Sequence, residues 1–165
     1  MKKSTLFTIF FLTIGLLIQA QSVSYSYRPL AEEGCSVNYT PTFIDDTAYI
    51  VVCVKSDRLV FNDNPTMMVR FFNTDQVLQL KGENINTLSH VGAVIVSNVL
   101  VPYTSLKAIA MFRITEQEMK LFTSGVERIR LSTFPIVHDR TFKKDKIGML
   151  LYQNYQAEKQ KAKNF

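Results

Sequence analysis

The feature that most constrains the fold is a succession of short strand-like runs joined by turns and not by helices. The clearest example is a pair of runs rich in β-branched residues, 92–96 and 99–103, which are separated only by Ser97 and Asn98. A two-residue connection of this kind predicts a β-hairpin. Because turn residues also separate most of the other runs, we expect antiparallel pairing throughout the sheet.

The other predicted strands alternate apolar and polar residues or form short runs of β-branched and aromatic residues. They are residues 23–27, 48–54, 66–72, 77–81, 106–114 and 128–133, with a short segment at 59–61. Two stretches, 30–46 and 82–89, are polar or rich in turn formers and are predicted to be connections.

Helical signals occur only late in the chain. Thr115 and Glu118 have the spacing of a capping box, and Gly125 marks the end of the short helix that follows. A basic run beginning at Lys143 is expected to open a final helix. Its apolar face would carry Ile147, Leu150, Leu151 and Tyr155. The chain is therefore predicted to be α+β and mostly β: an antiparallel β-sandwich-like fold or a curled sheet, with two helices late in the chain.

The first 20 residues have the pattern of a secretory signal peptide. Lys2 and Lys3 precede an apolar run from 6 to 18, and a small residue, Ala20, stands at the expected cleavage position. A retained membrane anchor is the alternative, but 13 residues are short of the ~20 that a spanning helix needs. We expect a bacterial protein exported to the periplasm or the extracellular space, with residues 21–165 forming one β-rich domain that has no transmembrane span.

The two cysteines, Cys35 and Cys53, leave two alternatives open. Export would place them in an oxidising compartment, where they could form a disulfide. Otherwise both are unpaired thiols. They do not form a Cys-x-x-Cys redox pair, and His90 and His138 lie far from them in sequence, so no metal site is predicted.

The positive charge of the chain is concentrated at its C-terminal end. The formal net charge is +5, and residues 143–165 contain six lysines against two acidic residues. The rest of the exported domain is nearly neutral, which together with export argues against nucleic-acid binding. A basic tail can bind an acidic partner, although a solvated helix end is the simpler interpretation. The candidate binding residues are Lys143, Lys144, Lys146, Lys159, Lys161 and Lys163.

No established catalytic pattern is present in the sequence. It lacks a G-x-S-x-G nucleophile elbow, an H-E-x-x-H zinc motif and a glycine-rich phosphate loop, so we predict no catalytic residue and no cofactor.

The leading hypothesis is a non-catalytic exported domain that binds another envelope or secreted protein, or an envelope component. A small hydrolase or carbohydrate-active protein using loop acids such as Asp45, Asp46 or Asp63 is the alternative. A third hypothesis is a protease inhibitor whose binding loop is 30–46, tied by Cys35. The oligomeric state stays open.

Residues from Thr115 to Tyr152 resemble a recurring C-terminal ending of small exported bacterial proteins of unknown function. The resemblance is carried by the helix start at Thr115 and Glu118, by Gly125, and by two segments, 128–133 and 142–148. It implies a β-rich extracytoplasmic domain, and it transfers no catalytic or ligand-binding residue to this chain.

Overall fold

The computed structural model describes residues 22–27, 35–96 and 98–163, and within these ranges the side chains of 26, 27, 35, 94, 96, 101 and 163 are not described. Its elements are β1 (Val23–Tyr27), β2 (Cys35–Ile44), β3 (Thr47–Ser56), β4 (Val60–Phe61), β5 (Thr66–Phe71), β6 (Val77–Val96), β7 (Val99–Arg113), α2 (Glu116–Leu121), the 3₁₀ turn η1 (Phe122–Ser124), β8 (Val126–Leu131), β9 (Thr133–Phe134), β10 (His138–Thr141) and α3 (Gly148–Lys163).

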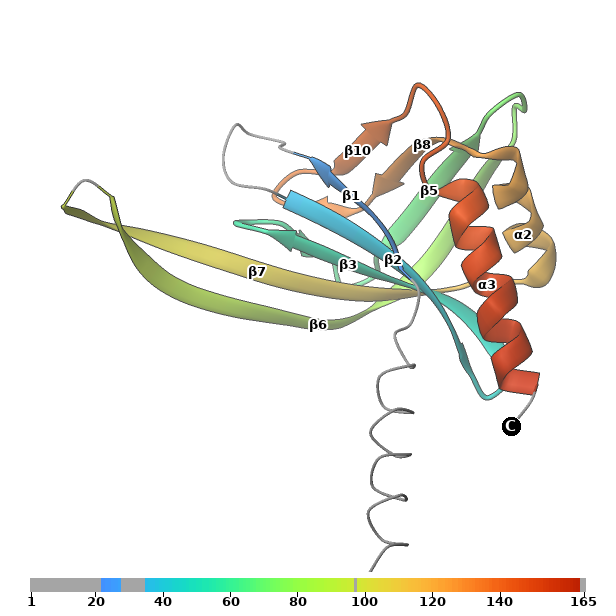
Figure 1. Ribbon diagram of the computed structural model, residues 1–165, viewed down its shortest axis with the longest axis horizontal. Helices are drawn as coiled ribbons and strands as arrows, with labels where there is room; N and C mark the ends of the chain where they lie inside the picture. The colour runs from blue at the N-terminus through green and yellow to red at the C-terminus, as the bar shows by residue number, and fades with distance from the viewer. Residues whose placement is uncertain (1–21, 28–34, 97, 164–165) are drawn as a thin grey trace, which may run out of the picture.

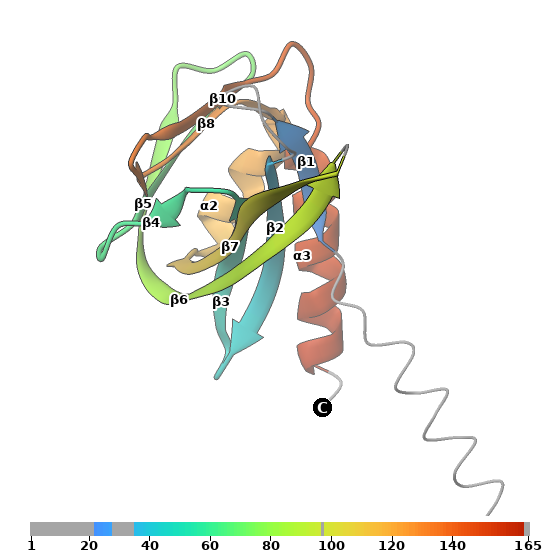
Figure 2. The same ribbon diagram turned by 90° about the vertical axis from the view of Figure 1, so that its left-hand side faces the viewer.

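Eight of these strands form one curled antiparallel sheet. Its strand order is β1-β2-β3-β7-β6-β5-β8-β10, and β4 pairs separately with β9. Figure 1 shows the sheet with α3 along one side, and Figure 2 shows the strands curling around the interior. The prediction of a mostly β, antiparallel fold with two late helices is confirmed, and the curled sheet is the alternative that forms.

The curl brings the two edge strands, β1 and β10, together. The Tyr25 hydroxyl lies 2.6 Å from Nε2 of His138, and the Tyr25 ring contacts the Phe142 ring edge-on at 5.2 Å. These side-chain contacts join strands that have no backbone pairing with each other among the described residues. The sheet is therefore an open barrel whose two edges are held together by a seam of side chains.

The hydrophobic core lies on the inner face of this sheet. Alternate residues are buried along β3, β5 and the inner part of β7, as period-two side-chain geometry requires. The largest fully buried side chains are Tyr39, Ile50, Leu59, Met67, Phe71, Phe112, Met119, Phe122, Ile129, Leu131, Ile147 and Leu151. Helix α2 contributes Met119, and α3 lies along β2, where Tyr155 packs against Phe43 with ring centroids 5.3 Å apart.

The capping box at Thr115 is confirmed. The Glu118 backbone N–H donates to the Thr115 hydroxyl, and the Thr115 backbone N–H donates to the Glu118 carboxylate at 2.8 Å. Gly125 ends the following 3₁₀ turn with a φ of 77°, a left-handed value that favours glycine.

The final helix begins later than the sequence predicted. The residues around Lys143 form bends, and α3 starts at Gly148 because Asp145 caps it. The Asp145 carboxylate accepts backbone N–H groups from residues 147, 148 and 149 of the helix start and from Val126 at the start of β8. Leu150, predicted to be part of the apolar face, is 53% exposed.

Two predicted connections are wrong. Residues 35–44 of the predicted 30–46 loop form β2, and residues 28–34 lie outside the described part of the chain. The prediction failed because Pro41 was read as a strand breaker. Pro41 lies past Tyr39, which pairs with Val23 at the start of β1, so among the described residues β2 has a partner only on the β3 side there, and a missing N–H is tolerated. The predicted connection 82–89 is strand within β6, so the predicted strands 77–81 and 92–96 belong to one continuous strand, which pairs with β5 on one side and with β7 on the other.

Among the described residues, neither helix combines the length and the apolar character needed to cross a bilayer.

Candidate interaction surface

The largest unusual feature of the molecule is the outer part of the β6–β7 hairpin, which we call the arm and define as residues 90–105. Strand β7 pairs with β3 only from Leu106 to Arg113, and β6 pairs with β5 only from Val77 to Lys81. Beyond these pairings, β6 and β7 pair only with each other among the described residues. Figure 1 shows it as a curved ribbon that leaves the body of the protein. At ~3.4 Å per residue, the arm extends roughly 20 Å.

The arm continues the core-facing side of the sheet. On β7, the even-numbered residues Ala108, Ala110 and Phe112 are fully buried in the core. On β6 a bulge at Ile85 shifts the register, so that odd-numbered residues share this face in the arm. The inner face of the arm therefore carries Val91, Ala93, Ile95, Leu100, Pro102 and Thr104.

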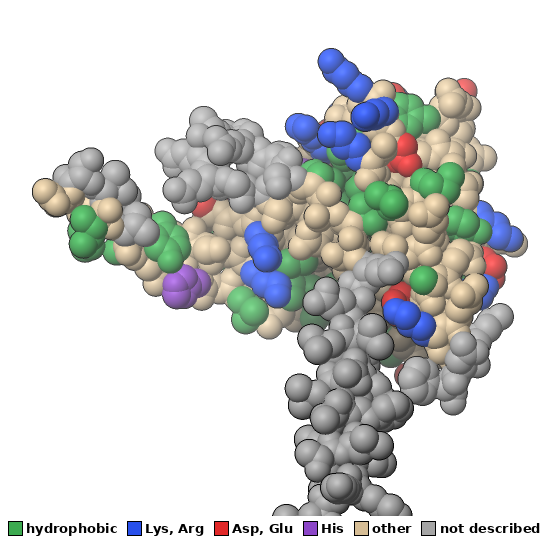
Figure 3. All heavy atoms as spheres, viewed as in Figure 1, with side chains coloured by type: hydrophobic (Ala, Val, Ile, Leu, Met, Phe, Trp, Pro, Cys, Tyr) green, Lys and Arg blue, Asp and Glu red, His purple; other side chains and the backbone are tan. Residues whose placement is uncertain are grey.

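The apolar side chains of this inner face are exposed. Val91, Ile95 and Leu100 are 72%, 74% and 68% exposed, and Val99 on the outer face is 61% exposed. No Asp, Glu, Lys or Arg occurs between Glu83 and Lys107. Figure 3 shows hydrophobic side chains along the outer part of the arm and no charged ones in that view. A contiguous apolar surface of this kind on a folded domain is typical of interaction sites.

The two edges of the arm differ in their ability to pair with another strand. Strand β7 carries Pro102, which has no backbone N–H and so weakens its edge as a pairing template. Residues 86–96 of β6 contain no proline and no charged residue. Native proteins protect edge strands with such residues because an unprotected edge pairs with other chains. The β6 edge is therefore the one prepared to accept a strand.

Tyr103 covers a glycine on the outer face of the arm. Gly92 is its cross-strand partner, and a Cβ added at Gly92 would lie 2.7 Å from the Tyr103 ring atoms. The His90 ring lies 6.1 Å from the Tyr103 ring, centroid to centroid. The outer face therefore carries the polar groups of His90 and Tyr103 beside the exposed Val99.

A second surface lies on the outer face of the sheet, over β5, β8 and β10. Asp139 accepts two hydrogen bonds from Arg128, at 2.7 and 2.6 Å, and two from Arg130, at 2.9 and 2.7 Å. The hydrogen bonds from Arg128 and Arg130 outweigh the partial burial and lower the pKa of Asp139 to about 2. Arg70 lies directly opposite Arg128 in the sheet register.

The lysines proposed as a binding surface do not form one patch. Lys143, Lys144 and Lys146 lie before α3, whereas Lys159 and Lys161 lie in its last turns, separated from residue 148 by about 17 Å of helix. Lys159 pairs with Glu116 at 2.5 Å and Lys161 pairs with Glu158 at 2.7 Å. The side chain of Lys163 lies outside the described side chains.

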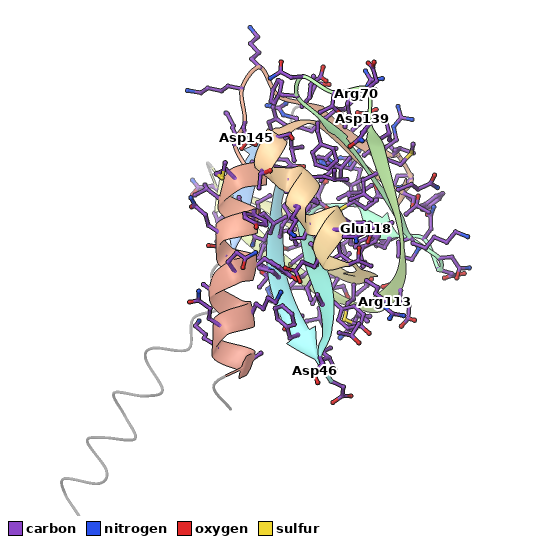
Figure 4. The ribbon with its side chains drawn as sticks, turned by 90° about the vertical axis from the view of Figure 1, so that its right-hand side faces the viewer. Asp46, Arg70, Arg113, Glu118, Asp139 and Asp145 are labelled. Carbon is purple, nitrogen blue, oxygen red and sulfur yellow. The ribbon has the colours of Figure 1, made fainter. Side chains whose placement is uncertain are left out.

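The candidate loop acids are also dispersed. Asp45 and Asp46 form the turn between β2 and β3 with positive φ values of 47° and 61°, a conformation that Asp tolerates and tight hairpin turns require. Figure 4 shows Asp46 at the far end of the molecule from Asp139. Asp63 lies in the turn before β5. Within the described ranges, no group of three or more His, Cys, Asp or Glu side chains could hold a metal ion.

The register of β2 and β3 does not bring the cysteine backbones together. Cys53 is opposite Asn38, three positions along β2 from Cys35, and it is a free thiol. Three strand positions correspond to roughly 10 Å, whereas a disulfide needs Cα atoms within about 7 Å. A bridge between Cys35 and Cys53 would therefore require the strands to move. Burial raises the pKa of the Cys53 thiol, more than Lys107 and Lys55 lower it, which makes it less reactive.

Comparison with known proteins gives no relative from which a role could be transferred: no family model, no curated protein and no solved structure matches the chain.

Sequence reasoning located both strands of the arm but not its significance. The two-residue turn and the runs 92–96 and 99–103 were predicted as a hairpin, yet its apolar residues were not assigned to an interaction. The absence of charge from 84 to 106 is the sequence signal that could have identified it. A strand pair that packs against a core only by its inner face normally carries charged residues on its solvent-exposed positions.

Proposed function

We propose that this protein is a non-catalytic exported binding domain and that its arm holds an extended apolar segment of another envelope or secreted protein. The observation that carries the proposal is the exposure of Val91, Ile95 and Leu100 on a surface that continues the core-facing side of the sheet. Export is inferred from the signal-like residues 1–20.

The chemistry of the arm defines the partner. A partner carboxylate or ammonium group buried against the arm would find no opposite charge, which is costly. The partner segment is therefore uncharged and apolar where it contacts residues 90–105. Its backbone adds as a strand to the open β6 edge, so that hydrogen bonds supply affinity while the inner-face side chains supply selectivity.

Two other occupants fit the arm less well. A lipid bilayer would leave the unpaired backbone groups of both strand edges without hydrogen-bond partners in hydrocarbon. A second copy of the chain would have to match the curvature of the arm (Figure 1) with a curved hairpin of its own, whereas a single extended strand can bend to follow it. An extended strand follows the curve of the arm, so it covers both the edge and the apolar side chains.

The test uses a photo-crosslinking amino acid placed at Ile95 in the full-length protein, expressed in the cells that export it. Gln79 is the matched control, because it lies on β6 and is exposed but faces the outside of the sheet. We expect one protein to crosslink at position 95 and not at position 79. The identified partner, once purified, should bind the wild-type protein and lose at least roughly tenfold in affinity for Val91→Lys/Ile95→Lys, because each lysine would bury an unpaired charge.

The remaining outcomes would overturn the proposal. Crosslinks only between copies of this chain would identify the arm as a dimerisation element. Binding of the wild-type protein, but not the double-lysine variant, to phosphatidylglycerol vesicles would identify a membrane contact. A purified partner that binds the wild-type protein and Val91→Lys/Ile95→Lys with equal affinity would show that the arm is not the binding site.

A further inference from the structure

A shallow pocket of about 110 Å³ lies on the outer face of the sheet, on the side opposite to the core. Its walls are formed by Met68, Arg70, Val77, Arg128 and Arg130. The pocket is independent of the arm, because its residues lie on β5, β8 and the first residues of β6. Its lining combines three guanidinium groups with two apolar side chains.

The pocket carries more positive charge than its neighbours neutralise. Asp139 pairs with Arg128 and Arg130, whereas Arg70 has no carboxylate within 4 Å among the described residues. Arg70 and Arg128 are direct cross-strand partners, and like charges in such positions repel each other. An anion placed between them would convert this repulsion into attraction.

The arginine side chains retain unused hydrogen-bond donors. Arg128 and Arg130 each use Nε and Nη2 on Asp139, and within the described part of the chain no acceptor lies within hydrogen-bond distance of either Nη1. A guanidinium has five N–H donors in a planar arrangement that matches a carboxylate. Because Asp139 fixes both groups from one side, their remaining donors are oriented before any ligand arrives.

We propose that this pocket binds a carboxylate that carries a short apolar substituent. The carboxylate lies between Arg70 and the Nη1 groups of Arg128 and Arg130, and the substituent contacts Met68 and Val77. Asp139 demonstrates that the arginine pair accepts a carboxylate. Since one water occupies ≈ 30 Å³, the pocket has room for a carboxylate with a few carbon atoms, either a small organic acid or the C-terminus of a peptide.

The binding test is an NMR titration of the ¹⁵N-labelled protein, monitored at the arginine Nε–Hε resonances. The probes are propanoate, trialanine, trialanine amide and inorganic phosphate. Propanoate saturating the Arg70 resonance would support a free acid, and trialanine binding lost on amidation would support a peptide C-terminus. Phosphate binding as tightly as both would overturn the assignment to a carboxylate with an apolar substituent.

Three variants locate the site. Arg70→Gln should weaken the preferred probe roughly ten- to a hundredfold, because a charge-assisted hydrogen bond is lost. Asp139→Asn should strengthen binding, because it removes the negative charge that competes for both arginines while the amide oxygen can still accept one of the hydrogen bonds that orient them. Lys81→Gln removes the same charge from the same sheet face, outside the pocket, and should change the affinity less than about twofold. Equal losses for Arg70→Gln and Lys81→Gln, or no saturable binding of any probe, would overturn the proposal.

Discussion

The Tyr25 hydroxyl lies 2.6 Å from His138 Nε2, and this contact joins the first strand of the sheet to the last. The Tyr39 hydroxyl lies 3.0 Å from that of Tyr25, which extends the polar chain into the interior. The Tyr25 hydroxyl can donate to an unprotonated Nε2 or accept from an Nε2–H group, whereas protonation of the ring would place a charge in this buried seam. The closure of the open barrel is therefore linked to the protonation of one histidine.

Acidification should destabilise the protein through this residue. Burial lowers the pKa of His138 to about 4, with Asp139 raising it and Arg140 lowering it by smaller amounts. In the unfolded chain, His138 binds a proton near pH 6.5. The contribution of the neutral, buried ring to the free energy of unfolding is therefore complete above about pH 6.5 and is lost as the pH falls toward about 4. The full loss is on the order of 3 kcal/mol. Urea unfolding of the wild type and of His138→Gln at about pH 7 and about pH 4.5 measures it. Equal pH dependence in both proteins would contradict this prediction.

Gly148 should not tolerate alanine, although alanine normally favours a helix by about 1 kcal/mol. A Cβ there would lie 2.6 Å from the carbonyl oxygen of Phe122 and 2.9 Å from the backbone of Gly125 and Val126. We expect Gly148→Ala to lower the free energy of unfolding by more than about 2 kcal/mol. The control is Gly92→Ala, where the Cβ meets only the Tyr103 ring, which can rotate away. Thermal unfolding that shows equal losses for the two variants would contradict the assignment of backbone contacts at Gly148.

Asp145 should contribute more to stability than an ordinary helix cap. Its carboxylate accepts four backbone N–H groups, which together outweigh the effect of burial and lower its pKa. We expect Asp145→Ala to cost about 2 kcal/mol in unfolding free energy. Since the folded pKa is depressed, the contribution should be present above about pH 4 and lost as the pH falls further. Asp75→Ala, in the exposed β5–β6 turn, is the control. A loss no larger than that of the control would show that the cap is not energetically significant.

Charge introduced on the arm should leave the fold intact. Val91 and Ile95 make no contribution to the buried core, so Val91→Lys/Ile95→Lys should change the free energy of unfolding by less than about 0.5 kcal/mol. Solubility should rise because an apolar patch is interrupted. Urea unfolding and the concentration at the onset of precipitation measure these effects. A large loss of stability would mean that these side chains already pack within the folded molecule.

The sequence was sufficient to predict the fold where local signals agree with tertiary structure. The capping box at Thr115, the strand at 48–54 and the pairing of 92–96 with 99–103 each have a local physical cause that the structure retains. The prediction failed where the cause is tertiary. Pro41 is compatible with a strand because, among the described residues, β2 pairs with β1 only as far as Tyr39, and residues 82–89 are strand although their composition is polar, because β7 pairs with them.

The candidate sites were harder to predict because they depend on what strand pairing brings together. Arg70 and Arg128 are 58 positions apart in the chain, yet they are adjacent in the sheet. The adjacency of the two arginines and the ion pair between Arg128 and Asp139 both follow from the strand order β5-β8-β10. The sequence alone did not determine this order. The candidate lysines are dispersed for a different reason. Three of them precede α3 and the others lie in its last turns, so the length of the helix separates the two groups.

The position of the arm within the sheet has a mechanical consequence. Strands β6 and β7 are the two middle strands of the eight, not an appendage on an edge. Tension applied at residue 98 would therefore run along both strands into the centre of the sheet. There it would act across the hydrogen bonds to β3 and β5, which lie perpendicular to the strands and share the load. A partner that pulled on the arm would therefore load the centre of the domain and not one of its edges.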